Sequence, residues 1–117
     1  AAGLRPILRT GNDDPAAPPL EGVRVVEFDA YTAGPYAGGL LAGWGADVVR
    51  VEPLDGDPSR ATGFGSFHFN RRKRSLAINL KAPDTAAAVR EGMRQFDVLL
   101  ENTAPVSLAG WGSGTTT

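Results

Sequence analysis

The side chains of this sequence that are best suited to chemistry are basic ones that could hold an anion. The segment "FNRRKRSLAINLKAP" contains a tetrad, Arg71 to Arg74, and a single Lys81 further along. The tetrad could grip a phosphate, contact nucleic acid, or form a solvated or interface-forming edge. We interpret it first as an edge, and we regard Lys81, a compact point charge, as the better phosphate ligand.

The overall charge argues against a nucleic-acid partner. The 117 residues include 12 Lys and Arg against 13 Asp and Glu, so the net charge is −1. Binding driven by phosphate contacts needs a basic face, and no second basic cluster supports the tetrad. We therefore expect no nucleic acid among the partners.

Other kinds of site are limited by composition. The chain has no cysteine and one histidine, which excludes disulfides and thiolate metal sites, and we expect no metal site of another type. No apolar run approaches the length of a membrane-spanning helix, so we expect no membrane partner. The chain is expected to be soluble and cytoplasmic, and cut from something longer.

The remaining polar residues suggest structural roles. His68 has no carboxylate near it in the sequence and is expected in a loop, and Asp57 in "GDPS" suggests turn chemistry. Glu52 and Glu101 end buried strands, where a carboxylate needs a partner, and Arg50 is a candidate. No nucleophile–base pair is visible, so no catalytic residue is predicted.

Four strands are predicted from short β-branched or apolar runs. They are "VRVVEF" (23–28), "DVVRVE" (47–52), "SLAINL" (75–80) and "DVLLE" (97–101). Strands that alternate with helices are typical of a parallel sheet with right-handed crossovers. The sequence therefore predicts an α/β fold, a Rossmann-like parallel sheet with βαβ units.

Two helices are predicted between these strands. The first begins at Pro35, taken as its first residue, and ends before Gly45. Its apolar face is expected to be Ala37, Leu40, Leu41 and Trp44, with Trp44 in the core. The second begins at Pro83, and its buried side is expected to be Ala86, Val89, Met93 and Phe96.

The domain organisation follows from these elements. Residues 1–19 are predicted to be a flexible arm or linker, 20–109 the Rossmann-like part, and 110–117 a flexible tail. The stretch 53–70 is predicted to be a long loop, of a length that is usually functional or disordered.

Ligands of open parallel sheets lie beyond the carboxyl ends of the strands. This rule selects residues 29–35, the stretch from 53 onward, 79–82 and 102–105. The first of these leads into a helix whose N–H groups could face an anion. "TAGPYAGG" imitates a dinucleotide fingerprint, but its glycines lack the G-x-G-x-x-G spacing, so NAD or FAD is not favoured.

Four blocks of the sequence together resemble a known family. The blocks are "PLEGVRVVEF", "AGPYAGGLLAGWGADVVRVEPLDGDPSR", "NRRKRSLAINLKAP" and "FDVLLENTAP". In this order they resemble the N-terminal segment of class III CoA-transferases, which include formyl-CoA and carnitine CoA-transferases, with alpha-methylacyl-CoA racemase as a relative. The resemblance runs from Pro19 to about Gly112.

The resemblance implies a CoA-binding role. Carried over by position, the residues expected to contact coenzyme A or an acyl-CoA are Thr32, Ala33, Ile78, Asn79, Leu80, Lys81, Asn102, Thr103 and Ala104. These are strand-end residues of the kind that the sheet rule selects. The chain departs from the family at Thr32, where formyl-CoA transferase has Gln, and at Thr103 and Ala104, where Phe and Arg are common.

The resemblance also bears on activity and partners. It implies a two-domain chain that interlocks with a second copy as a homodimer, and a catalytic Asp beyond the end of this sequence. Transfer of CoA between acyl-CoA and a carboxylic acid is the leading hypothesis, with the chain alone inactive. The alternatives are an acyl-CoA racemase fragment and a non-catalytic truncated paralogue acting as an assembly module.

Overall fold

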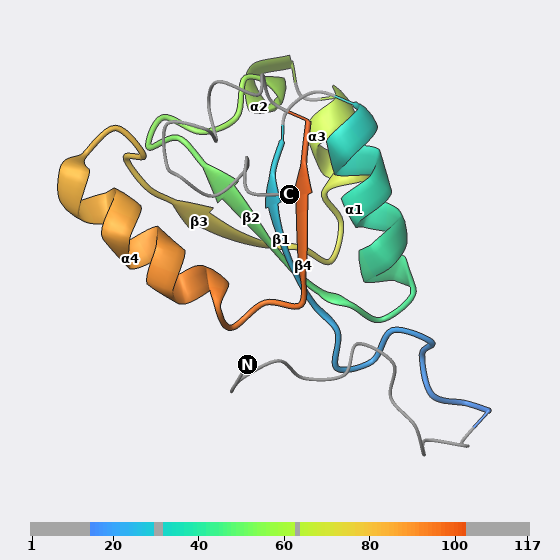
Figure 1. Ribbon diagram of the computed structural model, residues 1–117. Coiled ribbons are helices and arrows are strands. Elements are labelled where there is room, and N and C mark those ends of the chain that lie inside the picture. Colours follow the sequence, from blue (N-terminus) through green and yellow to red (C-terminus); the bar gives the residue numbers. More distant parts are fainter. Residues whose placement is uncertain (1–14, 30–31, 63, 103–117) are drawn as a thin grey trace.

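The computed structural model describes residues 15–29, 32–62 and 64–102. They form one parallel sheet of four strands in the order β3-β2-β1-β4. The strands are β1 (Arg24–Phe28), β2 (Asp47–Glu52), β3 (Arg74–Ala77) and β4 (Val98–Glu101). The α/β fold with βαβ units that the sequence predicts is therefore confirmed (Figure 1).

Two longer helices cover opposite faces of this sheet (Figure 1). They are α1 (Ala33–Gly43) and α4 (Pro83–Met93), and two short helices, α2 (Ser59–Thr62) and α3 (Phe64–Phe69), lie between β2 and β3 in the chain. The predicted loop at 53–70 thus contains helical turns, and His68 lies in α3 rather than in a loop. Among the described residues, no helix combines the length and the apolar composition of a membrane-spanning segment.

The core is divided between the two faces because successive side chains of a strand point to opposite sides. Val25 and Val48 pack with Ala42 on the α1 side. Val26 and Phe28 belong to the cluster on the α4 side. The apolar side predicted for the second helix is largely confirmed, because Val89, Met93 and Phe96 pack against that cluster.

Helix α1 begins two residues earlier than the sequence suggests. Thr32 is its N-cap, so Pro35 is the third helical residue rather than the first. Proline is tolerated there because N–H groups of the first turn have no partner within the helix. Gly45, directly after the capping Trp44, has a φ of 101°, the left-handed conformation expected where a helix ends.

The predicted buried face of α1 is partly wrong. Its buried residues are Gly34, Pro35, Gly38 and Ala42. Leu41 packs against the core, but Leu40 and Trp44 are 41% and 52% exposed. The physical reason is space: the carboxylates of Asp29 and Glu27 lie beneath α1, where a Cβ at Gly34 or Gly38 would clash with them.

The other boundaries agree closely, and β2 has the predicted bounds. Strand β3 ends at Ala77, earlier than predicted, and Glu101 of β4 is exposed rather than buried. Most of the arm predicted for residues 1–19 and all of the tail predicted for 110–117 lie outside the described residues.

Candidate functional site

The carboxyl ends of the four parallel strands bring residues of all four predicted stretches to one edge of the sheet. Phe28 of β1 is paired in register with Glu101 of β4, and the chain order reverses between these two neighbours. Such a reversal is where open parallel sheets bind ligands. Thr32 and Ala33, at the start of α1, and Asn102, directly after β4, are exposed at this position.

The start of α1 has features suited to an anion. The Thr32 side chain makes no capping hydrogen bond, and no acidic residue lies in the first turn. The N–H groups of Ala33 and Gly34 point along the helix axis at the positive end of its dipole. Asp29 already lies against the inner side of this turn, because its Oδ2 would be 2.7 Å from a Cβ at Gly34. The exposed outer side at Thr32 and Ala33 is the part that a negatively charged group of a ligand can reach.

A hollow of about 430 Å³ lies beyond the ends of β2 and β3. Its lining residues are Pro53, Leu54, Asp55, Ile78, Asn79, Leu80 and Lys81. The backbone N–H of Lys81 donates to Asn79 Oδ1 at 3.1 Å, which fixes the turn that carries the ammonium group. Lys81 is exposed, so the ammonium group on its flexible side chain can reach a ligand in the hollow.

The predicted site residues are therefore spread along the edge. Strands are spaced about 4.8 Å apart, so the step from β3 to β4 across three spacings is roughly 14 Å. A ligand that contacts both Lys81 and Asn102 must be extended. Thr103 and Ala104 lie outside the described residues.

A cluster of buried charges lies behind this edge, on the α1 face of the sheet. Glu27 and Asp29 follow Val25 on one face of β1, and Arg50 and Glu52 follow Val48 on the same face of β2. The α1 face is thus apolar near the amino ends of the strands and charged near their carboxyl ends. The sequence signal for this cluster is the recurrence of charged residues at every second position near the end of both strands, which the predicted site residues do not include.

Arg50 lies at the centre of this cluster. Its Nη1 donates to Glu52 Oε1 at 2.9 Å, and its Nη2 pairs with Asp57. Its Nε lies 3.5 Å from Glu27 Oε1 and 3.6 Å from Asp29 Oδ1. The expected pairing of Arg50 with Glu52 is confirmed.

Asp57 also has the turn role that its sequence context suggests. Its Oδ1 accepts a hydrogen bond from the backbone N–H of Ser59 at 2.6 Å, at the start of α2. Arg60 of α2 then donates from Nε and Nη2 to the two carboxylate oxygens of Glu52, at 3.1 and 2.9 Å. The loop after β2 is thereby anchored to the sheet.

Lys73 is the second buried cation. Its Nζ lies 2.6 Å from Glu27 Oε1, and it also donates to the carbonyl of Pro35 at 2.8 Å and to Asn70 Oδ1 at 3.0 Å. A Cβ at Gly38 would be 1.9 Å from Glu27 Oε2 and 3.0 Å from this ammonium. The buried ion pair therefore requires glycine on the inner side of α1.

Burial sets the pKa values of these groups. Removal from water raises the pKa of Glu27 to about 7, against the opposing effect of the Lys73 hydrogen bond. Burial also raises the pKa of Asp29 and lowers that of Lys73. For Glu52, burial is outweighed by hydrogen bonds from Arg60 and Ser75, and the pKa is lowered.

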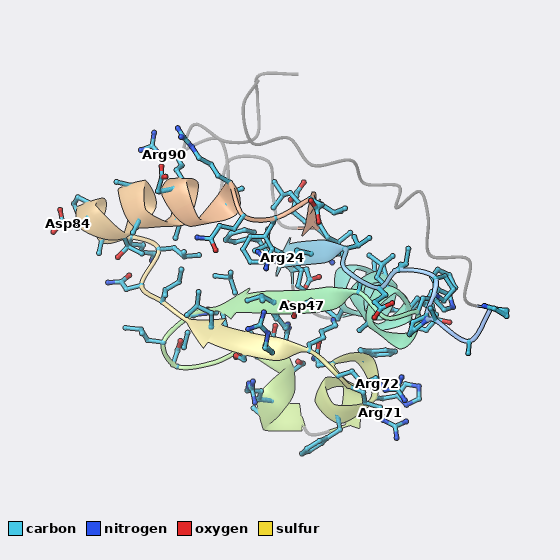
Figure 2. The ribbon with its side chains drawn as sticks, turned by 90° about the horizontal axis from the view of Figure 1, so that it is seen from below. Arg24, Asp47, Arg71, Arg72, Asp84 and Arg90 are labelled. Atoms are coloured by element: carbon cyan, nitrogen blue, oxygen red, sulfur yellow. The ribbon has the colours of Figure 1, made fainter. Side chains whose placement is uncertain are left out.

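The basic tetrad is divided by the structure. Lys73 is buried in the cluster, and Arg74 pairs at the surface with Asp47 at 2.6 Å. Arg71 and Arg72 are exposed, at the turn before β3 (Figure 2). Within the described part of the chain, no three His, Asp or Glu side chains are grouped so as to hold a metal ion.

Comparison with known proteins gives a consistent result. A family model described as CoA-transferase family III matches residues 20–117. The succinate–glutarate CoA-transferase of Agrobacterium fabrum is 42% identical over 110 residues, which cover 81% of this chain and 28% of that protein. The succinyl-CoA–D-citramalate CoA-transferase of Chloroflexus aurantiacus is 40% identical over 105 residues, which cover 82% of this chain and 26% of that protein.

Solved structures of related proteins support the same family. Rv3272 from Mycobacterium tuberculosis superposes with a TM-score of 0.79 at 33% identity, over 85% of this chain and 28% of that one. A CAIB/BAIF family protein from Brucella suis superposes with a TM-score of 0.74 at 34% identity, over 81% of this chain and 28% of that one. The chain spans about a quarter of the length of these relatives. The resemblance noted in the sequence is confirmed, and the chain belongs to CoA-transferase family III.

Proposed function

We propose that this chain is the N-terminal, CoA-binding portion of a CoA-transferase that moves CoA between an acyl-CoA and a carboxylic acid. The observation that carries the proposal is the hollow at the ends of β2 and β3. Its lining includes Ile78, Asn79, Leu80 and Lys81, which are four of the residues expected to contact CoA. Relatives named as CoA-transferases support transfer over the racemase alternative.

CoA is an extended molecule with phosphates at one end and a thioester at the other, and the site edge suits that shape. Lys81 would pair with a phosphate as a point charge. The N–H groups at the start of α1 would face a second anionic group. Asn102 could donate and accept hydrogen bonds at the reversal between β1 and β4.

The acyl transfer itself is proposed to need residues outside this chain. Such chemistry requires a carboxylate nucleophile held against the thioester. Among the described residues the buried carboxylates, Glu27, Asp29, Glu52 and Asp57, lie within the ion cluster behind the edge. We therefore expect this chain alone to exchange no CoA between thioesters and free acids.

Assembly with further polypeptide is part of the proposal. Succinyl-CoA–L-malate CoA-transferase of Chloroflexus aurantiacus has alpha and beta subunits that both match this chain. A homodimer and a cytoplasmic location remain predictions from the family. The truncated, non-catalytic paralogue, which would keep the fold as an assembly module, remains the alternative.

Thermal unfolding with CoA, dephospho-CoA and NAD tests the CoA site. A ligand at 100 times its dissociation constant adds about 2.7 kcal/mol to stability. We expect stabilisation by CoA that weakens without the 3′-phosphate and is lost in Lys81→Ala. Arg90→Ala, at an exposed cation on α4 that does not line the hollow, is the matched control and should behave as the wild type. Equal effects of NAD and CoA would contradict the proposal.

A further inference from the structure

Arg71 and Arg72 are exposed cations that the fold does not use. Neither makes an ion pair with another described residue, whereas Lys73 and Arg74 in the same tetrad do. Figure 2 shows both arginines beside α3, away from Arg90 on α4. Their charge is therefore available to a group outside the described part of the chain.

The backbone at Arg72 is in an unusual conformation. Its φ is 65°, and it is the one residue other than glycine with a positive φ among those described. Asparagine and glycine adopt this conformation with less steric conflict than arginine does. Arginine at this position therefore costs some backbone strain, and residues in sparsely populated conformations are found more often at functional surfaces.

A groove of about 320 Å³ runs beside these arginines, between α1 and α3. Its lining residues are Tyr36, Gly39, Leu40, Gly43, His68, Phe69, Arg71 and Arg72. Gly39 lets the helices approach closely, because a Cβ there would be 2.7 Å from the Phe69 carbonyl oxygen. The groove combines aromatic and aliphatic walls with two guanidinium groups at one side.

The aromatic wall of the groove is ordered by its own contacts. The Tyr36 and Phe69 rings meet edge to face with centroids 5.8 Å apart, and the His68 ring lies 5.3 Å from that of Phe69. This is the geometry that aromatic pairs prefer. A rigid wall can bind an apolar side chain without first having to be ordered.

An apolar stripe continues the groove along α1. Tyr36, Leu40 and Trp44 recur every four residues on its outer face, and 51%, 41% and 52% of their surfaces are exposed. Phe67 of α3 is 82% exposed and lines a second hollow that also includes Arg71. Large apolar side chains exposed beside one another on a helix face are a feature of surfaces that contact other proteins.

We propose that the α1–α3 groove, with its stripe and two arginines, is a docking surface for an acidic segment of another polypeptide. Carboxylates of that segment pair with Arg71 and Arg72, and an apolar side chain beside them enters the groove against Tyr36 and Leu40. Charge complementarity argues for an acidic segment, and the length of the stripe argues for a polypeptide rather than a small anion.

The probe for this surface is a display library of random linear peptides, selected against the intact chain. We expect the selected peptides to combine Asp or Glu with an aromatic or aliphatic residue. A synthetic peptide of the selected sequence should bind at least about tenfold more weakly to Arg71→Glu than to the wild type. Its affinity should fall as salt is added. Arg90→Glu, an equal change of charge on α4, should leave the affinity unchanged.

Arg72→Asn separates binding from stability. Asparagine keeps the left-handed turn with less strain, so this variant should unfold at a higher temperature and yet bind the peptide more weakly. A variant that loses binding because it is misfolded would instead unfold at a lower temperature. Binding that Arg72→Asn and Arg71→Glu both leave intact would overturn the proposal.

If the groove binds something other than an acidic segment, the same experiments give different results. Each of those results would also overturn the proposal. Displacement of the peptide by millimolar inorganic phosphate, with shifts of the groove amides, would indicate a small-anion site. Self-association in sedimentation experiments that Arg71→Glu abolishes would indicate a second copy of this chain. Selection of no peptide, or of peptides without acidic residues, would show that the surface does not recognise an acidic segment.

Discussion

Glu27 is the group whose protonation should govern how the stability of this chain depends on pH. Its side chain has no solvent exposure, and burial raises its pKa from 4.5 to about 7. The folded chain therefore binds more protons than the unfolded chain between these two values. Stability should accordingly fall as pH rises from about 4.5 to 7, and level off above.

The size of this effect follows from the pKa change. One pKa unit corresponds to about 1.4 kcal/mol, so a rise from 4.5 to about 7 gives roughly 3 kcal/mol across the window. Asp29, whose pKa is also raised by burial, adds a change in the same direction. Below pH 4.5 the trend reverses, because the lowered pKa of Glu52 makes its contribution disappear as pH falls.

Urea unfolding over a series of pH values measures this dependence. Glu27→Gln removes the titrating group while keeping the shape of the side chain. The fall in the free energy of unfolding between pH 4.5 and 7 should therefore be smaller in this variant, by the contribution that Glu27 makes in the wild type. Glu91→Gln, at a carboxylate that is 74% exposed, should keep the wild-type slope. Stability that rises with pH across this window, or a slope that Glu27→Gln leaves unchanged, would refute the reasoning.

Two further predictions concern the packing and pairing around the buried charges. Gly38→Ala places a Cβ 1.9 Å from Glu27 Oε2 and should lower the free energy of unfolding by at least about 2 kcal/mol. Gly92→Ala, whose added Cβ would have no neighbouring atom within 4 Å, should raise the free energy of unfolding by about 0.5–1 kcal/mol. Equal effects of the two substitutions in urea unfolding would contradict the close packing of α1. Above pH 7, where Glu27 is ionised in the wild type, Lys73→Met removes the cation that pairs with it and should lower stability by about 3–5 kcal/mol. Arg74→Met, at a pair that is 67% and 43% exposed, should lower it by less than about 1 kcal/mol. Similar losses for both would show that the tetrad is not divided between interior and surface.

Much of the fold could be predicted from local signals. Pro83 begins α4 as expected, and Asp47–Glu52 forms β2 with the predicted bounds, because proline and β-branched runs act through their own backbone geometry. The rule that ligands lie at strand carboxyl ends selected Asn79–Lys81, which line the hollow there. That rule needs only the order of elements along the chain.

The inner face of α1 could not be predicted from the spacing of large apolar residues. That spacing points Leu40 and Trp44 inward, but Glu27 occupies the space beneath the helix and admits only Gly38. Which residue of β1 fills that space depends on tertiary packing. The division of the tetrad has the same origin, because Lys73 is drawn inward by a carboxylate 46 residues earlier in the chain.

Backbone amide NMR of the intact chain during titration with CoA tests the central claim most directly, because it locates the ligand residue by residue. CoA binding at the strand ends predicts that the amides of Ala33, Ile78–Lys81 and Asn102 shift together, and that those of the α1–α3 groove at Arg71 and Arg72 do not. Shifts confined to the groove, or no shifts at the strand ends at saturating CoA, would contradict the assignment of the CoA site.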